Sequence, residues 1–241
     1  MTKVAKYLES SLNTKNLFSY LGLFLFTIIT QNIYLNIETI EWDIASYLVA
    51  SQGIENGILP NQTQWESKGP IFIYLYYLFS LQAENTLVIF KLINDLILFL
   101  ISLILFKTIL SKTKEHIHAF VSSILFLSIM SQVWAQSGYS EIYSLLFLSI
   151  SYFIITNYRF NNLSYLLIGV LFSISSLINQ GTVIFLLPIL ISELTLNSQK
   201  TYLRKVINLG IGFTIPHLFF LFLYLANNLI DIYLATYLTI P

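Results

Sequence analysis

Two side chains in one polar segment, Asp43 and Lys68, have the types and the setting to act on a substrate. The carboxylate of Asp43 can serve as a general base that accepts the proton of an acceptor hydroxyl. The ammonium of Lys68, the only basic residue of the segment, can pair with the phosphate of a lipid. Each residue also has a structural explanation, because Asp43 can cap a helix and Lys68 can be a solvated lysine. For each residue, the functional and the structural explanation are both open at this point.

The segment that contains both residues is a long loop, 37–69, between the first two apolar stretches. Loops of this length in a chain with otherwise short connections are usually functional. Residues 43–57 have the pattern of an amphipathic helix that ends at Gly57. The apolar side chains that form this pattern are Ile44, Tyr47, Leu48 and Ile54. We expect a surface helix at 43–57 and a second one at 70–82, because Pro70 suits a first helical turn.

The chain as a whole is poor in charge: of its 241 residues, 10% are charged and 56% are hydrophobic. A typical soluble domain has about 25% charged and 45–50% apolar residues. So few charges cannot cover a globular surface, which argues against a soluble enzyme, a nucleic-acid binder and a disordered protein. The composition predicts an all-α, polytopic membrane protein surrounded by lipids.

The residue types also limit the possible cofactors. Cysteine is absent, which excludes disulfides, thiolate catalysis and Cys-based metal sites. The three histidines, His116, His118 and His217, do not form a ligand cluster, and there is no Gly-rich phosphate loop and no basic run. We therefore expect no cofactor or metal site built by the protein and no nucleic-acid partner.

Seven apolar segments are long enough, or nearly so, for a bilayer core about 30 Å thick, which takes roughly 20 helical residues. They are 17–36, 86–110, 117–135, 141–158, 163–179, 181–197 and 206–226. Segment 70–82 is shorter and holds three tyrosines, which favours a helix at the membrane surface. We expect a bundle of about seven transmembrane helices and two surface helices.

Charge placement gives the expected orientation. With the N-terminus in the cytoplasm and 70–82 outside the spans, ten of the twelve basic residues fall on the cytoplasmic side. That bias follows the positive-inside rule. Most acidic residues then lie on the outer face, where external loops tolerate them. The loop 37–69 and the C-terminus are predicted to be external.

One pair of ionisable residues, Lys91 and Asp95, falls inside the predicted span 86–110. Such residues in membrane helices are functional candidates, and this pair could meet a lipid phosphate. The alternative is an ion pair in which the two residues, four positions apart on a helix, neutralise each other.

The types and spacing of the loop residues also match a known pattern. The matching residues are Trp42, Asp43, Tyr47, Gly57, Pro60, Trp65, Lys68, Gly69 and Pro70. This string resembles the first external loop of integral-membrane glycosyltransferases of the GT-C fold. It is most similar to the bacterial relatives of dolichyl-phosphate-mannose protein mannosyltransferases and of the aminoarabinose lipid A transferase.

The resemblance extends along nearly the whole chain. It includes Lys91-Leu92, Ser140-Glu141-Ile142, Gly169–Gln180 and Asn228–Asp231. The chain departs from the family pattern at three positions, because Gly69 and Tyr143 stand where the family has proline and Gln180 stands where it often has lysine.

The resemblance implies a seven-span module that transfers a sugar from a polyprenyl-phosphate carrier to an acceptor on the outer membrane face. It implies Asp43 as the catalytic base, with Glu41, Lys68, Glu141 and Gln180 as substrate-binding residues. Lys68 would be the charge partner of the lipid phosphate. Glu141 would orient a sugar or acceptor hydroxyl, although an anion at a helix N-terminus is also favourable without any function. Some relatives use a divalent metal and others need none.

The resemblance also bears on location and extent. It implies the inner membrane of a bacterium, with the active face outside. Because relatives usually continue with more spans and a soluble domain, we expect 1–241 to be a single transmembrane module that lacks a C-terminal part. A lipid or polysaccharide transporter or flippase and a catalytically incomplete fragment are the alternatives. The sequence does not indicate the sugar, the carrier length or the acceptor.

Overall fold

The computed structural model describes residues 14–31, 42–81, 86–132, 138–157, 162–188, 191 and 199–239. Within these ranges every regular element is helical and there is no strand, which confirms the all-α prediction. The α-helices are α2 (Thr14–Gln31), α3 (Trp42–Gln52), α4 (Pro70–Ser80), α5 (Thr86–Thr113), α6 (His116–Ile129), α8 (Ser140–Asn157), α9 (Asn162–Ile178), α11 (Gln199–Ala226) and α12 (Ile230–Leu234). Short helical turns follow three of them, at η2 (Gly53–Asn56), η3 (Gln180–Phe185) and η4 (Ala235–Thr239).

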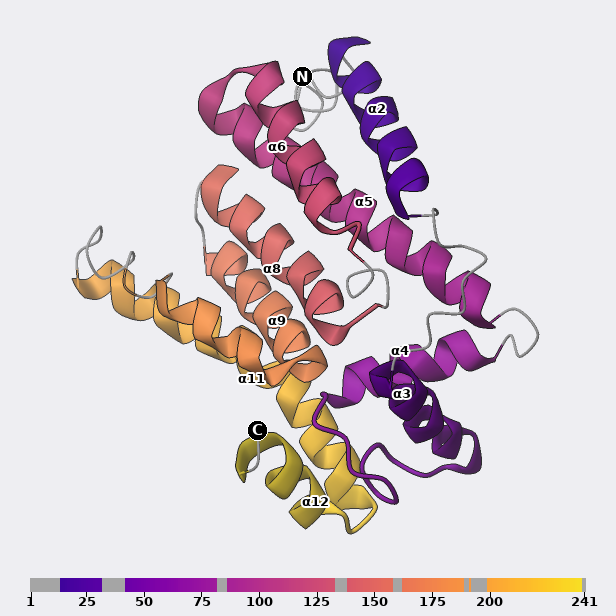
Figure 1. The fold of residues 1–241 in the computed structure, drawn as a ribbon. Helices are drawn as coiled ribbons and strands as arrows, with labels where there is room; N and C mark the ends of the chain where they lie inside the picture. The colour runs from indigo at the N-terminus through magenta and orange to yellow at the C-terminus, as the bar shows by residue number, and fades with distance from the viewer. Residues whose placement is uncertain are drawn as a thin grey trace.

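The long helices form two neighbouring groups, α2 with α5 and α6, and α8 with α9 and α11 (Figure 1). The short helices α3 and α4 pack against each other at the end of the molecule where α5 begins and α11 ends (Figure 1). Helices are therefore present at both positions where surface helices were predicted. The first is α3 continued by η2, and it ends at Gly57 in the left-handed conformation (φ 75°). The second is α4, which has Pro70 in its first turn.

Two described helices are long and apolar enough to cross a membrane, Val88–Thr113 and Tyr202–Ala226. Only 28% and 17% of their apolar windows are buried, so most of this apolar surface faces outward, unlike the core helix of a soluble protein. The structure thus supports a membrane protein.

Judged by helix length and apolar composition, the described helices include fewer spans than the predicted number of about seven. Three other apolar helices are shorter, Pro70–Ser80, His116–Ile129 and Leu163–Ile178. The 14 residues of α6 extend over about 21 Å at 1.5 Å each, less than the bilayer core. Helices α2 and α8 have 18 residues, but polar residues such as Lys15, Glu141 and Asn157 stand near their ends. Of the predicted span 181–197, most of the second half lies outside the described residues.

Contacts near the helix ends show which ends lie together. The ammonium of Lys107, late in α5, lies 5.6 Å from the ring centre of Tyr20, early in α2. Likewise Lys205, early in α11, lies 5.0 Å from the ring centre of Tyr165, early in α9. These basic residues therefore belong to helix ends remote from α3 and α4, which lie near the start of α5 and the end of α11 (Figure 1).

Helices α9 and α11 approach each other closely at two glycines. A Cβ atom at Gly169 would lie 2.1 Å from the carbonyl oxygen of Leu209, and one at Gly212 would lie 2.0 Å from that of Leu166. Any larger residue at either position would collide with the backbone of the other helix. Small residues at a membrane-helix interface allow this kind of backbone packing.

Substitution of Gly169 or Gly212 by leucine should force α9 and α11 apart and lower the free energy of unfolding by about 1–3 kcal/mol or more. The thermal unfolding midpoint of the purified protein in detergent measures this loss. Gly210→Ala is the matched control, because a Cβ atom there meets nothing within 4 Å. Equal midpoints for Gly169→Leu and Gly210→Ala would contradict the close contact.

Candidate functional site

Asp43 lies in the first turn of α3 with an exposed side chain. Because α3 begins at Trp42, Asp43 is a helical residue and does not occupy the cap position before the helix. Its backbone carbonyl oxygen accepts a hydrogen bond of 2.8 Å from the Ser46 hydroxyl. A carboxylate in a first turn is favoured by the helix dipole, and its exposure leaves it accessible to a substrate.

A buried tyrosine on α3 fixes the position of Asp43 relative to α4. Tyr47 is 1% exposed and packs edge-on against Phe72 and Tyr76, with ring centres 4.9 and 5.3 Å away. Burial raises the pKa of Tyr47, and the charges of Asp43, Glu66 and Glu141 raise it further. Carboxylates of α3, of the loop before α4 and of the start of α8 therefore all contribute to the raised pKa.

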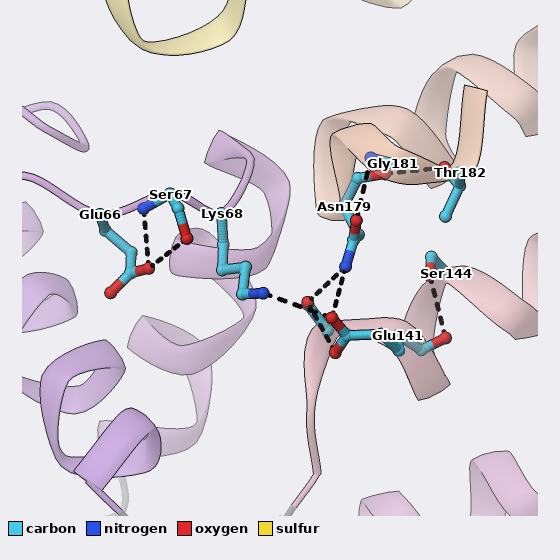
Figure 2. A network of polar contacts seen from close by, with 9 residues as sticks. Glu66, Ser67, Lys68, Glu141, Ser144, Asn179, Gly181 and Thr182 are labelled. Carbon is cyan, nitrogen blue, oxygen red and sulfur yellow. Dashed lines mark hydrogen bonds and ion pairs between the residues drawn. The ribbon is translucent and has the colours of Figure 1, made fainter. Parts of the chain in front are cut away.

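Lys68 forms an ion pair with Glu141, in which the ammonium nitrogen lies 3.3 Å from the carboxylate oxygen Oε1 (Figure 2). The side chain of Lys68 is 20% exposed and that of Glu141 is 56% exposed. The interpretation of Lys68 as an isolated solvated lysine is therefore wrong. The structure joins the two predicted substrate-binding residues although 73 positions separate them in the chain.

Glu141 accepts two further hydrogen bonds. The amide nitrogen Nδ2 of Asn179 donates to Oε1 at 2.8 Å, and the hydroxyl of Ser140 donates to Oε2 at 3.2 Å. Burial raises the pKa of Glu141, but its own backbone N–H and Lys68 lower it by more, so the net shift is downward. The ion pair therefore persists at neutral pH and is lost only as the pH falls below the usual range of a glutamate.

The position of Lys68 depends on the next residue, Gly69. The backbone N–H of Gly69 donates to the carbonyl oxygen of Ile178 at 3.0 Å, which joins the loop to the end of α9. A Cβ atom at Gly69 would lie 1.9 Å from the carbonyl oxygen of Leu177. Proline has neither the N–H nor the small size needed here. The contact therefore requires glycine at position 69.

Other predicted residues have different surroundings. Gln180 donates from Nε2 to the carbonyl oxygen of Thr236 at 3.2 Å, so it links η3 to η4. Lys91 and Asp95 lie four residues apart on α5 and are both partly buried, and their role in binding stays a prediction. Glu41 lies outside the described residues.

Sequence reasoning missed Asn179 and the role of Glu66. Asn179 follows the last residue of α9, where a polar residue after an apolar helix is ordinary and carries no signal. The carboxylate of Glu66 accepts hydrogen bonds from the Ser46 hydroxyl at 3.0 Å and the Ser67 N–H at 2.8 Å. Glu66 thus holds the loop against α3 and, unlike Glu141, does not form the ion pair with Lys68.

The part of the chain that the structure describes contains no group of three or more His, Asp or Glu side chains arranged to hold a metal ion. His217 is bonded to two neutral residues, with its ring nitrogens 2.9 Å from the Ser176 hydroxyl and 3.1 Å from the Tyr233 hydroxyl.

The chain matches no family model, and neither the curated proteins nor the solved structures that were compared with it include a match.

Substitution of Gly69 by alanine should displace the loop from α9 and separate Lys68 from Glu141. The clash should cost about 1–3 kcal/mol of the free energy of unfolding. It should also make Lys68 react faster with an amine-acetylating reagent, which peptide mass spectrometry measures. The matched control is Thr63→Ala, an exposed residue of the same loop. The thermal unfolding midpoint measures the loss of stability. A Gly69→Ala protein with the same unfolding midpoint and the same Lys68 acetylation rate as the control would contradict this account.

Proposed function

We propose that this protein is an integral-membrane glycosyltransferase that moves a sugar from a polyprenyl-phosphate carrier to an acceptor at the outer membrane face. The observation that carries the proposal is the joint placement of Asp43 and Lys68. Glu66, two residues before Lys68, accepts a hydrogen bond from Ser46, three residues after the exposed Asp43, so the loop that carries the lysine is bound to the helix that carries the carboxylate. Transfer from a lipid phosphate needs both kinds of group near each other.

The proposed membrane arrangement has about seven spans, with the N-terminus inside and the loop that carries Asp43 outside. Two helices meet the criteria for a span on their own, and the other five spans are part of the proposal. In support, Lys107 and Lys205 belong to helix ends remote from α3 and α4. Basic residues at one end and the carboxylate-bearing loop at the other agree with the positive-inside rule.

In the proposed reaction, Asp43 accepts the proton of the acceptor hydroxyl as its oxygen attacks the anomeric carbon of the sugar. The bond between that carbon and the phosphate oxygen breaks on the opposite side, so the configuration inverts. The negative charge that develops on the leaving phosphate is stabilised by the ammonium of Lys68. The step needs no metal from the protein to balance its charge, although a divalent ion bound with the substrate is compatible with it.

The remaining residues have supporting roles in the proposal. Tyr47 packs against Phe72 and Tyr76 and so holds α3 on α4. This packing fixes the position of the base, Asp43, relative to α4. Glu66 holds the loop to α3 through Ser46. Glu141 is the partner of Lys68 and lies near enough to orient a sugar hydroxyl.

Substitution of Asp43 by asparagine should lower the rate of sugar transfer by about 10²–10⁴-fold, because the amide cannot accept the proton. The assay follows radiolabelled sugar from a panel of polyprenyl-phosphate sugars into product in isolated membranes. The matched control is Glu55→Gln, which removes another carboxylate from the same surface segment, beyond the end of α3.

The rate in Glu55→Gln membranes should equal that of the unmodified protein. If the Asp43→Asn protein transfers sugar at the same rate as the unmodified protein, Asp43 is not the catalytic base. Absence of transfer from every polyprenyl-phosphate sugar in the panel by the unmodified protein would contradict the proposed function itself.

A further inference from the structure

The carboxylate of Glu141 is bound by three donors that come from separate parts of the chain. They are the ammonium of Lys68 at 3.3 Å, the amide Nδ2 of Asn179 at 2.8 Å and the hydroxyl of Ser140 at 3.2 Å (Figure 2). One cation and two neutral donors thus converge on a single anion. This is a set of donors that phosphate oxygens also accept.

The orientation of the Asn179 amide is determined by its other contacts. Its oxygen Oδ1 accepts a hydrogen bond of 3.1 Å from the backbone N–H of Gly181, so the amide nitrogen must point the other way. That nitrogen donates both to Glu141 and to the Ser140 hydroxyl, the latter at 3.0 Å. The Ser140 hydroxyl is thereby left to donate its own proton to the anion.

Backbone segments that carry the donors are held by contacts that do not involve the Glu141 carboxylate. The backbone contact of Gly69 with Ile178 positions the lysine. The hydroxyl of Thr182 donates to the Asn179 carbonyl oxygen at 2.7 Å, and Ser175 donates to Thr182 at 3.2 Å and to the Ser144 carbonyl oxygen at 3.1 Å. These bonds join the end of α9 to the start of α8.

Glu141 itself is the least confined member of the group. Its side chain is 56% exposed, whereas Lys68 is 20% exposed and Ser140 is fully buried. Rotation of the glutamate into water would leave Asn179 and Ser140 hydrogen-bonded to each other and the backbone beside Lys68 in place. The vacated position would then have a net positive charge from Lys68.

We propose that Lys68, Asn179 and Ser140 form the binding site for the phosphate of the substrate, and that Glu141 occupies this site when no phosphate is bound. The identity of that phosphate as the head of a polyprenyl carrier rests on the proposed function. When the carrier binds, its phosphate replaces the carboxylate on the same three donors. Exchange of one anion for another keeps the charge of Lys68 compensated throughout.

The experiment measures equilibrium binding to the purified full chain in detergent by native mass spectrometry. The three probes are a polyprenyl phosphate, the corresponding neutral polyprenol and inorganic phosphate. The variants are Lys68→Met, Asn179→Ala and Glu141→Gln. The matched control is Glu55→Gln, which neutralises an exposed carboxylate of η2 that takes no part in the contacts around Lys68. The reported quantity is the ratio of polyprenyl phosphate to polyprenol affinity, which loss of the apolar contacts alone would not change.

If Glu141 competes with the phosphate, the Glu141→Gln protein should show a ratio about two- to fivefold higher, the range expected when a partly exposed ion pair no longer competes. Asn179→Ala should lower the ratio several-fold, and Lys68→Met should lower it by about tenfold. Glu55→Gln should leave the ratio unchanged. A ratio that is unchanged or lower in Glu141→Gln, or unchanged in Asn179→Ala, would overturn the inference.

The outcomes for the proposed function are different. If polyprenyl phosphate binds no better than polyprenol to the unmodified protein, the lipid-carrier function fails. In that case, inorganic phosphate that binds in a manner dependent on Lys68 and Asn179, and more tightly in Glu141→Gln, would still support the anion site with a free phosphate as its ligand. Absence of both interactions would overturn the site as well.

Discussion

The hydrogen bond between the Gly69 N–H and the Ile178 carbonyl oxygen is the contact on which the position of the loop that carries Lys68 depends. It joins a loop near the start of the chain to the end of a helix more than a hundred residues later. Ile178 is completely buried, so the bond forms in a dry environment where an unpaired backbone group would be costly. Lys68 precedes this bond and α4 follows it, so one backbone contact positions both a charged side chain and the helix on which α3 rests.

From that contact the arrangement of the carboxylates follows. Tyr47 of α3 packs against the aromatic side chains of α4. Asp43, with an exposed side chain, lies in the first turn of α3. The end of α9 brings Asn179 to the start of α8, where Glu141 accepts from it. The C-terminal helices complete the support, because Tyr224 donates to the Pro60 carbonyl oxygen and Asn61 donates to the Tyr237 hydroxyl, both at 2.7 Å. Residues of α3, α9, α11 and η4 therefore stabilise one loop.

Local patterns in the sequence were sufficient for the helical class and for the two surface helices. The spacing of Ile44 and Tyr47, the stop at Gly57 and the proline at position 70 each act within a few residues, and α3 and α4 begin and end close to the predicted positions. The ion pair of Lys68 with Glu141 and the role of Asn179 could not be predicted in the same way. They depend on the packing of α9 against α4 and α8, which no local pattern encodes. Fewer described helices qualify as spans by length and hydropathy than the sequence predicted. Several of the predicted apolar segments extend past the ends of the described helices.

The glycine contacts between α9 and α11 have a consequence for the surroundings of the protein. A Cβ atom at Gly169 or Gly212 would collide with the backbone of the other helix, so α9 and α11 are in close backbone contact. Asn179 follows the last residue of α9, while most of the apolar surface of α11 faces outward. A long apolar helix adjusts its tilt to the thickness of the surrounding bilayer. In the proposed membrane arrangement, a change in the tilt of α11 would also move α9 and Asn179 at its end, so we expect the thickness of the lipid layer to influence the geometry around Glu141.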